Sequence, residues 1–304
     1  MPFKAASLVE EKFQSTDQRI LVGVCSARMH HALRQAARET WMSRPVEGIE
    51  VCFFVGAGEG GFLAEESDTL GLNCEDTYEA LPTKVKAFFS FALKTRKFDW
   101  IFKCDDDTYV ELERLPSLIS DDWNFVGNEF LLRRGTPSGG AGYLLSRQLV
   151  QAIVNDEKIP LFGAEDVLIG ESAIRHGAKT HATERLCWNK SRFPAVWNDT
   201  ITSHWCQADQ LKRIEAIRSI VPRMLDVQHS FWRDTLLLFP DGSFLRRSTA
   251  CQGTYQEDAD GVIRLKWNDW EGEVLIPLRG AQSNSKTGSE SRTVPAYSCR
   301  RIIP

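Results

Sequence analysis

Between residues 19 and 182 the chain alternates short apolar runs with segments of helical character, which limits the folds open to it. The apolar runs, each short enough for one buried strand, are residues 20–25, 51–55 and 100–102. The segments with helical composition or spacing are residues 29–41, 82–95, 146–155 and 165–176. Strands that alternate with helices predict a parallel sheet covered by helices, so the expected fold class is α/β.

The C-terminal part of the chain follows a different pattern. The pairs Asp241-Gly242 and Asp260-Gly261 separate short runs of β-forming residues, which is the sequence signature of hairpins. This pattern predicts a small antiparallel β domain after the α/β domain. The expected organisation is an N-terminal extension, an α/β domain, a helical linker and the β domain, at residues 1–18, 19–206, 207–227 and 228–304.

Composition argues against several classes of partner. The net charge is −4, so no broad basic surface indicates a nucleic-acid partner. The N-terminus lacks a signal-peptide core, and no apolar run approaches the ~18 residues of a membrane span. The eight cysteines include no CxxC pair, and several lie in apolar runs, which favours a reducing, cytoplasmic compartment. The alternative compartment is the Golgi lumen, if the chain is a shortened form of an anchored protein.

Three consecutive carboxylates, Asp105, Asp106 and Asp107, follow the third apolar run. Ligands gather at the carboxyl ends of parallel strands, and adjacent carboxylates repel one another unless a cation compensates. In an extended chain, Asp105 and Asp107 point to the same side. Their oxygens suit Mg²⁺ or Mn²⁺, which would bridge the phosphates of a nucleotide diphosphate. The alternative is a solvated acidic turn; the apolar residues on both sides favour a site.

Two arginines share one face of the first predicted helix. Arg34 and Arg38 are four residues apart, and Trp41 continues the same face. Guanidinium groups bind phosphates through paired hydrogen bonds, so this face suits a diphosphate. The alternative is a solvated basic face with Trp41 in the core.

Glu165 and Asp166 open the last helix of the α/β region. An ionised carboxylate beside an acceptor hydroxyl could take its proton. Capping of the helix N-terminus is a strong alternative. His204 is a possible metal ligand late in the chain, although a lone histidine is more often structural.

A cluster of glycines, Gly139, Gly140 and Gly142, lies just before Tyr143 and a predicted helix. Glycine lets the backbone approach a ligand closely. The cluster lacks the lysine and the spacing of a phosphate-binding P-loop. By itself it is therefore only a weak indication of a site.

Five stretches, taken in order, resemble the β1,3-galactosyltransferase superfamily (glycosyltransferase family 31), which includes β1,3-N-acetylglucosaminyltransferases, core-1 galactosyltransferase and Fringe. The stretches are RQAARETW at 34–41, EDTYEALPTK at 75–84, KCDDDTYV at 103–110, GGAGY at 139–143 and EDVLIG at 165–170. The resemblance implies a GT-A (Rossmann-like) fold, a UDP-sugar donor, Mn²⁺ or Mg²⁺, and an inverting displacement. It further implies transfer of galactose or an N-acetylhexosamine to a carbohydrate or glycoconjugate hydroxyl, forming a β1,3 linkage. A bacterial-type enzyme of polysaccharide biosynthesis is the expected setting.

The resemblance also implies roles for individual residues. Asp166 matches the catalytic base, and the metal-binding positions are Asp105, Asp107 and His204. The residues implied at the donor nucleotide are Arg34, Arg38, Asp76, Lys84 and Asp106. The residues implied to line the site on the acceptor side are Gly139, Gly140, Gly142, Tyr143 and Glu165.

Two other functions remain open from the residues alone. A nucleotidyltransferase also uses carboxylates at strand ends with Mg²⁺, but it releases pyrophosphate instead of UDP. A non-catalytic carbohydrate-binding protein would use the β domain, where Tyr255, Trp267 and Trp270 could stack on sugar rings. Core packing explains those aromatic residues at least as well.

Overall fold

The computed structural model describes residues 18–130, 135–189, 192–229, 231–247, 252–259, 261–268, 273–277 and 293–299. The chain divides between Arg218 and Ser219 into two compact units, an α/β unit and a C-terminal β unit. Nearly all of the expected N-terminal extension lies outside the described residues. Among the helices that are described, none has the length and apolarity to cross a membrane.

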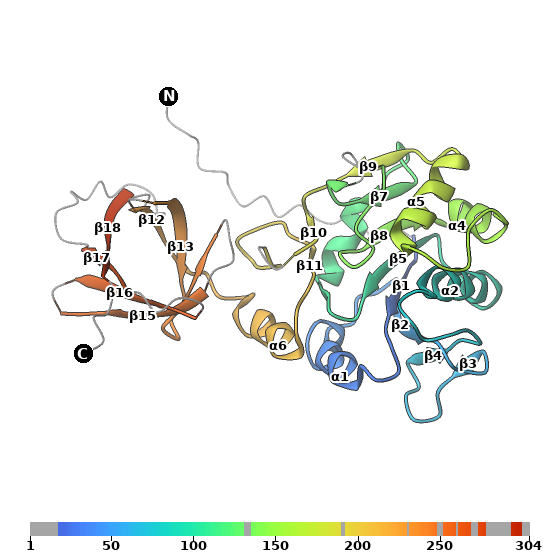
Figure 1. The fold of residues 1–304 in the computed structure, drawn as a ribbon, viewed down its shortest axis with the longest axis horizontal. Helices are drawn as coiled ribbons and strands as arrows, with labels where there is room; N and C mark the ends of the chain where they lie inside the picture. The colour runs from blue at the N-terminus through green and yellow to red at the C-terminus, as the bar shows by residue number, and fades with distance from the viewer. Residues whose placement is uncertain are drawn as a thin grey trace. The chain divides into compact units, whose positions relative to one another are not determined.

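The α/β unit is built on an eight-stranded sheet with the order β3-β4-β2-β1-β5-β8-β7-β9 (Figure 1). Its strands are β1 (Ile20–Cys25), β2 (Ile49–Val55), β3 (Gly61–Phe62), β4 (Thr69–Gly71), β5 (Trp100–Asp105), β7 (Phe125–Gly127), β8 (Tyr143–Ser146) and β9 (Thr180–Ala182). The α/β class is confirmed, and the parallel part comprises β4, β2, β1 and β5.

The sheet differs from the expected all-parallel arrangement beyond β5, because β8 pairs antiparallel with both β5 and β7. A parallel neighbour needs a long crossover, usually an α-helix. Between β5 and β8 the helices and strands that the structure describes are a 3-10 helix, η2 (Leu112–Leu118), and short strands. At β8 the chain returns in the opposite direction, and the sheet is mixed with a parallel core.

Three helices lie together on one side of this sheet: α2 (Leu81–Thr95), α4 (Arg147–Val154) and α5 (Glu165–Arg175) (Figure 1). Phe88 of α2 stacks on Phe54 of β2 with ring centroids 4.2 Å apart. Side chains alternate along a strand, so Phe53 faces the opposite side. There the guanidinium of Arg38, from α1 (His31–Glu39), lies 5.0 Å from the Phe53 ring centroid. Helices thus cover both faces.

The helix expected as a linker is α6 (Ala208–Ile217), and it belongs to the α/β unit. Lys212 of α6 pairs with Glu39 of α1 at 2.7 Å. The expected boundaries had placed this helix between two domains. The structure divides the chain after α6.

A second, small sheet brings the late part of the α/β unit back to the end of β5. It consists of β10 (Leu186–Cys187), β11 (Thr202–Ser203) and β6 (Tyr109–Val110). Thr202 pairs with Val110 and Ser203 with Tyr109 in antiparallel register. Because β6 begins two residues after Asp107, this register carries the residue after β11, His204, to the acidic turn.

The C-terminal unit is a closed sheet that forms a small barrel. Its strands are β12 (Arg223–His229), β13 (Arg233–Leu238), β14 (Ser243–Arg246), β15 (Gln252–Glu257), β16 (Val262–Trp267), β17 (Glu273–Pro277) and β18 (Thr293–Cys299). Consecutive strands pair antiparallel as expected, and a parallel pair of β12 and β18 closes the sheet. The hairpin signals therefore predicted β13 to β16, but neither β12, which begins inside the expected helical linker, nor β18 and the closure.

The aromatic residues considered as sugar readers take part in packing. Trp267 packs edge-on against Phe244, with centroids 4.7 Å apart, and its neighbours form the barrel core. The Tyr255 hydroxyl donates to the Phe239 carbonyl at 3.0 Å. Trp270 lies outside the described residues.

Candidate active site

The structure brings together the three residues predicted to bind a metal. One potential ligand atom from each of Asp105, Asp107 and His204 lies within 4.8 Å of the others. Asp105 ends β5, Asp107 lies in the turn that follows, and His204 comes directly after β11. Two carboxylates and one imidazole thus converge at the carboxyl edge of the parallel strands.

Hydrogen bonding determines which nitrogen of His204 faces the carboxylates. Its Nδ1 lies 3.1 Å from the carbonyl oxygen of Trp188. A carbonyl can only accept, so Nδ1 carries the proton and a neutral ring directs the Nε2 lone pair elsewhere. That Nε2 lies 3.1 Å from Asp107 Oδ1. A histidine held in this way is a typical metal ligand.

The same carboxylate oxygen is left unsatisfied by the protein. Asp107 Oδ1 is buried and has no hydrogen bond of acceptable geometry. Burial lowers the pKa of His204, but the nearby Asp107 and Asp105 carboxylates outweigh this, and the pKa is raised. The cluster therefore favours positive charge at this point, which a divalent cation could supply, so the residues present fit a metal site.

The glycine loop is required by the side chains around it. A Cβ on Gly140 would lie 2.1 Å from His204 Nε2, and a Cβ on Gly139 would lie 2.7 Å from Glu165 Oε2. The Gly140 carbonyl also accepts a hydrogen bond from Thr108 Oγ1 at 2.8 Å. The sequence predicted that glycine here would let a ligand approach the backbone closely. In the structure the groups in close approach are the side chains of His204 and Glu165.

A buried lysine, Lys103, joins the two halves of the site and was not assigned a role from the sequence. Its Nζ lies 2.8 Å from Asp105 Oδ1 and 3.1 Å from Glu165 Oε2. Burial lowers the pKa of Lys103, but the charges of Asp105 and Glu165 prevail and raise it well above its usual range. A lysine inside an apolar strand next to three aspartates was the available signal, because lysine is rarely buried without a partner.

Glu165 is held inside the protein, unlike its neighbour Asp166. Tyr143 donates its hydroxyl hydrogen bond to Glu165 Oε1. Burial raises the pKa of Glu165, although Lys103 opposes this shift. Glu165 and Tyr143, predicted to line the site, therefore lie behind it and fix the start of α5.

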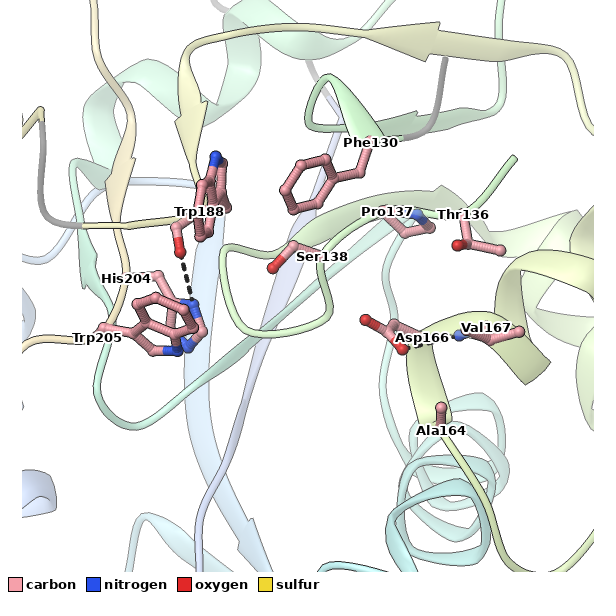
Figure 2. Close-up of a pocket in the computed structure, with 10 residues that line it drawn as sticks. All are labelled: Phe130, Thr136, Pro137, Ser138, Ala164, Asp166, Val167, Trp188, His204 and Trp205. Atoms are coloured by element: carbon pink, nitrogen blue, oxygen red, sulfur yellow. Dashed lines mark hydrogen bonds between the residues drawn. The ribbon is translucent and has the colours of Figure 1, made fainter. Parts of the chain in front are cut away.

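Asp166 faces an open cavity of about 440 Å³. Its Oδ1 accepts from the Val167 backbone N–H at 2.9 Å, and its Oδ2 from the Gly139 N–H at 3.3 Å. Figure 2 shows Asp166 on one side of this cavity and the rings of Trp188, His204 and Trp205 on the other. The remaining lining residues are Phe130, Thr136, Pro137, Ser138, Ala164 and Val167. The predicted base thus lines the same cavity as His204, one of the three residues of the metal cluster.

The two arginines of α1 are engaged with carboxylates of the protein. Arg34 is fully buried, and its Nε and Nη2 donate to the two carboxylate oxygens of Glu66 at 2.8 and 2.9 Å. Arg38 makes a similar pair with Asp68 at 2.8 and 2.6 Å. These carboxylate partners were not expected from the sequence, whereas Trp41 is buried in the core, as the alternative interpretation of this helix face predicted. Donor contact by the two arginines stays a prediction. Contact of Arg34 with a donor would require it to leave these partners.

Asp76 and Lys84 join loops at the carboxyl edge of the sheet. Asp76 accepts from the backbone N–H of Arg28 at 2.6 Å and of Gly56 at 2.8 Å, after β1 and β2 respectively. Lys84 Nζ donates to Asp76 Oδ1 and to the Ser26 carbonyl, both at 2.8 Å. Nucleotides bind at this edge in open α/β sheets, and donor contact by these residues stays a prediction.

Asp106 is separated from the other two aspartates. Its Oδ2 accepts from Ser26 Oγ at 2.6 Å and lies 3.0 Å from His30 Nδ1. The hydrogen bond with Asp106 raises the pKa of His30. Asp106 thus faces the loop after β1, on the side of the predicted nucleotide region, and its donor contact also stays a prediction.

Residues 32–131 match a family model described as Galactosyltransferase. A hydroxyproline O-galactosyltransferase (GALT2) of Arabidopsis thaliana is 29% identical, over 64% of this chain and 34% of its own. The probable beta-1,3-galactosyltransferase 12 of the same plant is 26% identical, over 48% of this chain and 47% of its own. The UDP-GalNAc:beta-1,3-N-acetylgalactosaminyltransferase 2 of Xenopus laevis is 27% identical, over 37% of this chain and 29% of its own. The chain thus spans less than half the length of these curated relatives.

Solved structures also resemble the chain. A glycosyltransferase involved in glycosylation of the major capsid of PBCV-1 has a TM-score of 0.43 and 15% identity, over 64% of this chain and 99% of its own. The mannosyltransferase PcManGT from Pyrobaculum calidifontis, in complex with GDP-Man and Mn2+, has a TM-score of 0.40 and 13% identity, over 56% of this chain and 55% of its own.

The family model covers the chain from α1 past the acidic turn, and so includes three of the five stretches on which the resemblance was built. The α/β unit has the mixed sheet with a parallel core that a GT-A domain requires, and its acidic turn lies at the carboxyl edge. The predicted resemblance is confirmed: about a third of the chain matches the Galactosyltransferase family model, and its curated relatives are galactosyl- and N-acetylgalactosaminyltransferases.

Proposed function

We propose that this protein is an inverting hexosyltransferase that moves galactose or an N-acetylhexosamine from a UDP-sugar to a carbohydrate hydroxyl, forming a β1,3 linkage. The observation that carries this proposal is one cavity lined by both Asp166 and His204, and His204 lies together with Asp105 and Asp107 in the metal cluster. The names of the relatives, which are galactosyl- and N-acetylgalactosaminyltransferases, support the choice of sugar.

Asp105, Asp107 and His204 would hold the metal ion, and Mn²⁺ is the ion we propose. Mg²⁺ demands a near-ideal octahedral shell of oxygen atoms, which a ligand set with an imidazole nitrogen does not supply. The resemblance to β1,3-galactosyltransferases supports Mn²⁺ as the alternative. When bound, the ion would supply Lewis-acid stabilisation of the negative charge on the departing diphosphate. Lys103 keeps Asp105 ionised and in place for this role.

Asp166 is the proposed general base. It lies in the first turn of α5, where backbone dipoles favour an ionised carboxylate. Its two hydrogen bonds to backbone N–H groups orient the carboxylate towards the cavity. There Asp166 takes the proton of the acceptor hydroxyl as that oxygen attacks the anomeric carbon and the UDP departs from the opposite face. A single displacement converts an α-linked donor sugar into a β-linked product.

The test is a screen of UDP-galactose, UDP-N-acetylgalactosamine and UDP-N-acetylglucosamine with Mn²⁺, with UDP release measured in the presence and absence of a panel of glycosides. We expect glycoside-dependent UDP release with at least one donor, and a β-linked disaccharide as product. Release of pyrophosphate would instead identify a nucleotidyltransferase. Binding of a glycoside without turnover of any donor would identify a carbohydrate-binding protein.

We also propose that the protein works in a reducing, cytoplasmic compartment. Cys25, Cys52 and Cys104 are buried free thiols in or beside β1, β2 and β5. Burial raises the pKa of Cys25 and that of Cys52 to about 12, so both thiols stay protonated and unreactive. Fractionation of the native source with an antibody to this chain tests the compartment, and recovery in the Golgi lumen would contradict it.

A further inference from the structure

An aromatic wall bounds the cavity on the side opposite Asp166. Trp188 and Trp205 meet edge to face, with ring centroids 5.4 Å apart and planes at 80°. Phe130 lies 5.1 Å from Trp188, measured between centroids. Figure 2 shows these rings facing the space between them and Asp166. The metal cluster uses the carbonyl of Trp188 but neither indole ring.

Trp205 adopts a backbone conformation that its side chain does not favour. Its φ is +66°, in the left-handed region, where a bulky non-glycine residue is a genuine outlier. Trp205 is 55% exposed, so burial of this residue offsets only part of the strain. Strained residues of this kind concentrate at ligand sites, where the surrounding structure holds them for a purpose other than folding.

The groups around the cavity match the chemistry of a sugar ring. The wall is aromatic, whereas the other side carries the hydroxyls of Thr136 and Ser138 and the carboxylate of Asp166. A pyranose has an apolar face of C–H groups and a rim of hydroxyls. Its C–H face can lie against the aromatic wall while its hydroxyls point towards the polar groups. The volume, about 440 Å³, lies within the usual range for small-ligand sites.

On the basis of the proposed function, we propose that Trp188 and Trp205 form the acceptor subsite. The apolar face of the acceptor pyranose lies against the two indole rings, and its attacking hydroxyl points to Asp166. The aromatic wall thereby selects a ring with an uninterrupted C–H face and sets which hydroxyl reaches the base. The left-handed backbone of Trp205 presents its indole to the cavity.

The test compares two variants of the full chain with the wild type. Trp205→Asn removes the indole and places at this position a residue that tolerates the left-handed region. Trp123→Phe is the matched control, because Trp123 stacks on His181, 4.1 Å away, and does not line the cavity. Binding of methyl β-D-galactopyranoside and of its N-acetylgalactosamine analogue is measured by saturation-transfer NMR with UDP and Mn²⁺ present.

We expect the wild type and Trp123→Phe to bind at least one glycoside, with the strongest transfer to the C–H protons of one ring face. Trp205→Asn should bind it at least tenfold more weakly. Its melting temperature should not fall, and Mn²⁺ should still raise that temperature, which shows that His204 remains in place. A structural role for Trp205 would instead lower the melting temperature.

Equal glycoside affinity in Trp205→Asn and the wild type overturns the subsite. So does binding of neither glycoside by the wild type, including the case in which a hydroxyproline peptide binds in their place. Mn²⁺-dependent binding of UDP to the wild type, measured by calorimetry, tests the proposed function separately. If the wild type does not bind UDP, the proposed function is refuted. If it binds UDP but Trp205→Asn binds the glycoside as well as the wild type does, only the acceptor subsite is refuted.

Discussion

Two groups of charged residues in the α/β unit can be compared directly: the arginine cluster of Arg34, Arg38, Glu66 and Asp68, and the metal cluster of Asp105, Asp107 and His204. In the arginine cluster each carboxylate receives paired hydrogen bonds from a guanidinium. In the metal cluster two carboxylates converge and one buried oxygen has no hydrogen bond.

The difference shows how to separate charges that stabilise the fold from charges that await a ligand. A buried charge costs free energy unless it is paired, so a complete cluster can hold elements together without help. An incomplete cluster keeps part of that cost, which a bound cation would remove. By this criterion the arginine cluster joins α1 to the turn before β4, and the metal cluster is the one that we expect to bind a ligand.

Removing a carboxylate from the arginine cluster should have the largest effect on stability. Glu66→Ala leaves the fully buried Arg34 without its paired carboxylate, and we expect the free energy of unfolding to fall by roughly 3–5 kcal/mol. Urea denaturation measures it. The control is Glu65→Ala, whose carboxylate is 59% exposed and should change stability by less than about 0.5 kcal/mol. Equal effects of the two changes would show that the arginine cluster is not essential.

Removing a carboxylate from the metal cluster should affect activity and spare the fold. Asp107→Ala relieves the repulsion with Asp105 and removes one metal ligand, so Mn²⁺ should no longer raise the melting temperature. We expect transfer to fall by roughly 10²–10³-fold, the scale of losing one charge-stabilising group. Asp199→Ala, which changes an exposed carboxylate, is the control. Full activity of Asp107→Ala would remove the metal assignment.

Replacement of the base should have a smaller effect, which separates catalysis from metal binding. In Asp166→Asn the side chain keeps its size but cannot take a proton, and we expect turnover to fall by roughly 10²-fold. UDP binding and the Mn²⁺-induced rise in melting temperature should stay near normal. Turnover equal to that of the wild type would place the base on another residue.

Acid should weaken the arginine cluster gradually. The hydrogen bond from Arg34 is the main cause that holds the pKa of Glu66 far below its usual range. A lowered pKa contributes stability above the unfolded value, about 4.3, and that contribution is lost as the pH falls further. Wild-type stability in urea should therefore decline below about pH 4 more steeply than that of Glu66→Gln. Parallel declines would exclude Glu66 as a contributor.

Local patterns in the sequence were sufficient for much of the fold. The apolar run of β1 and the spacing of α2 predicted both elements to within one residue, and the Asp-Gly pairs predicted the C-terminal hairpins. The acidic turn also followed from local order, because Asp105 and Asp107 follow a buried strand. These features depend on interactions between residues that are close along the chain, so a short stretch of sequence is enough to predict them.

What only the tertiary structure decided depends on partners far apart along the chain. Glu66 pairs with the buried guanidinium of Arg34, whose donor contact stays a prediction, and the pairing of β11 with β6 carries His204 to Asp107. The antiparallel return of β8 and the strained backbone of Trp205 belong to the same class. The type of a residue determines the charge or ring of its side chain. Strand register and helix packing determine which group that side chain contacts, and both are properties of the folded chain.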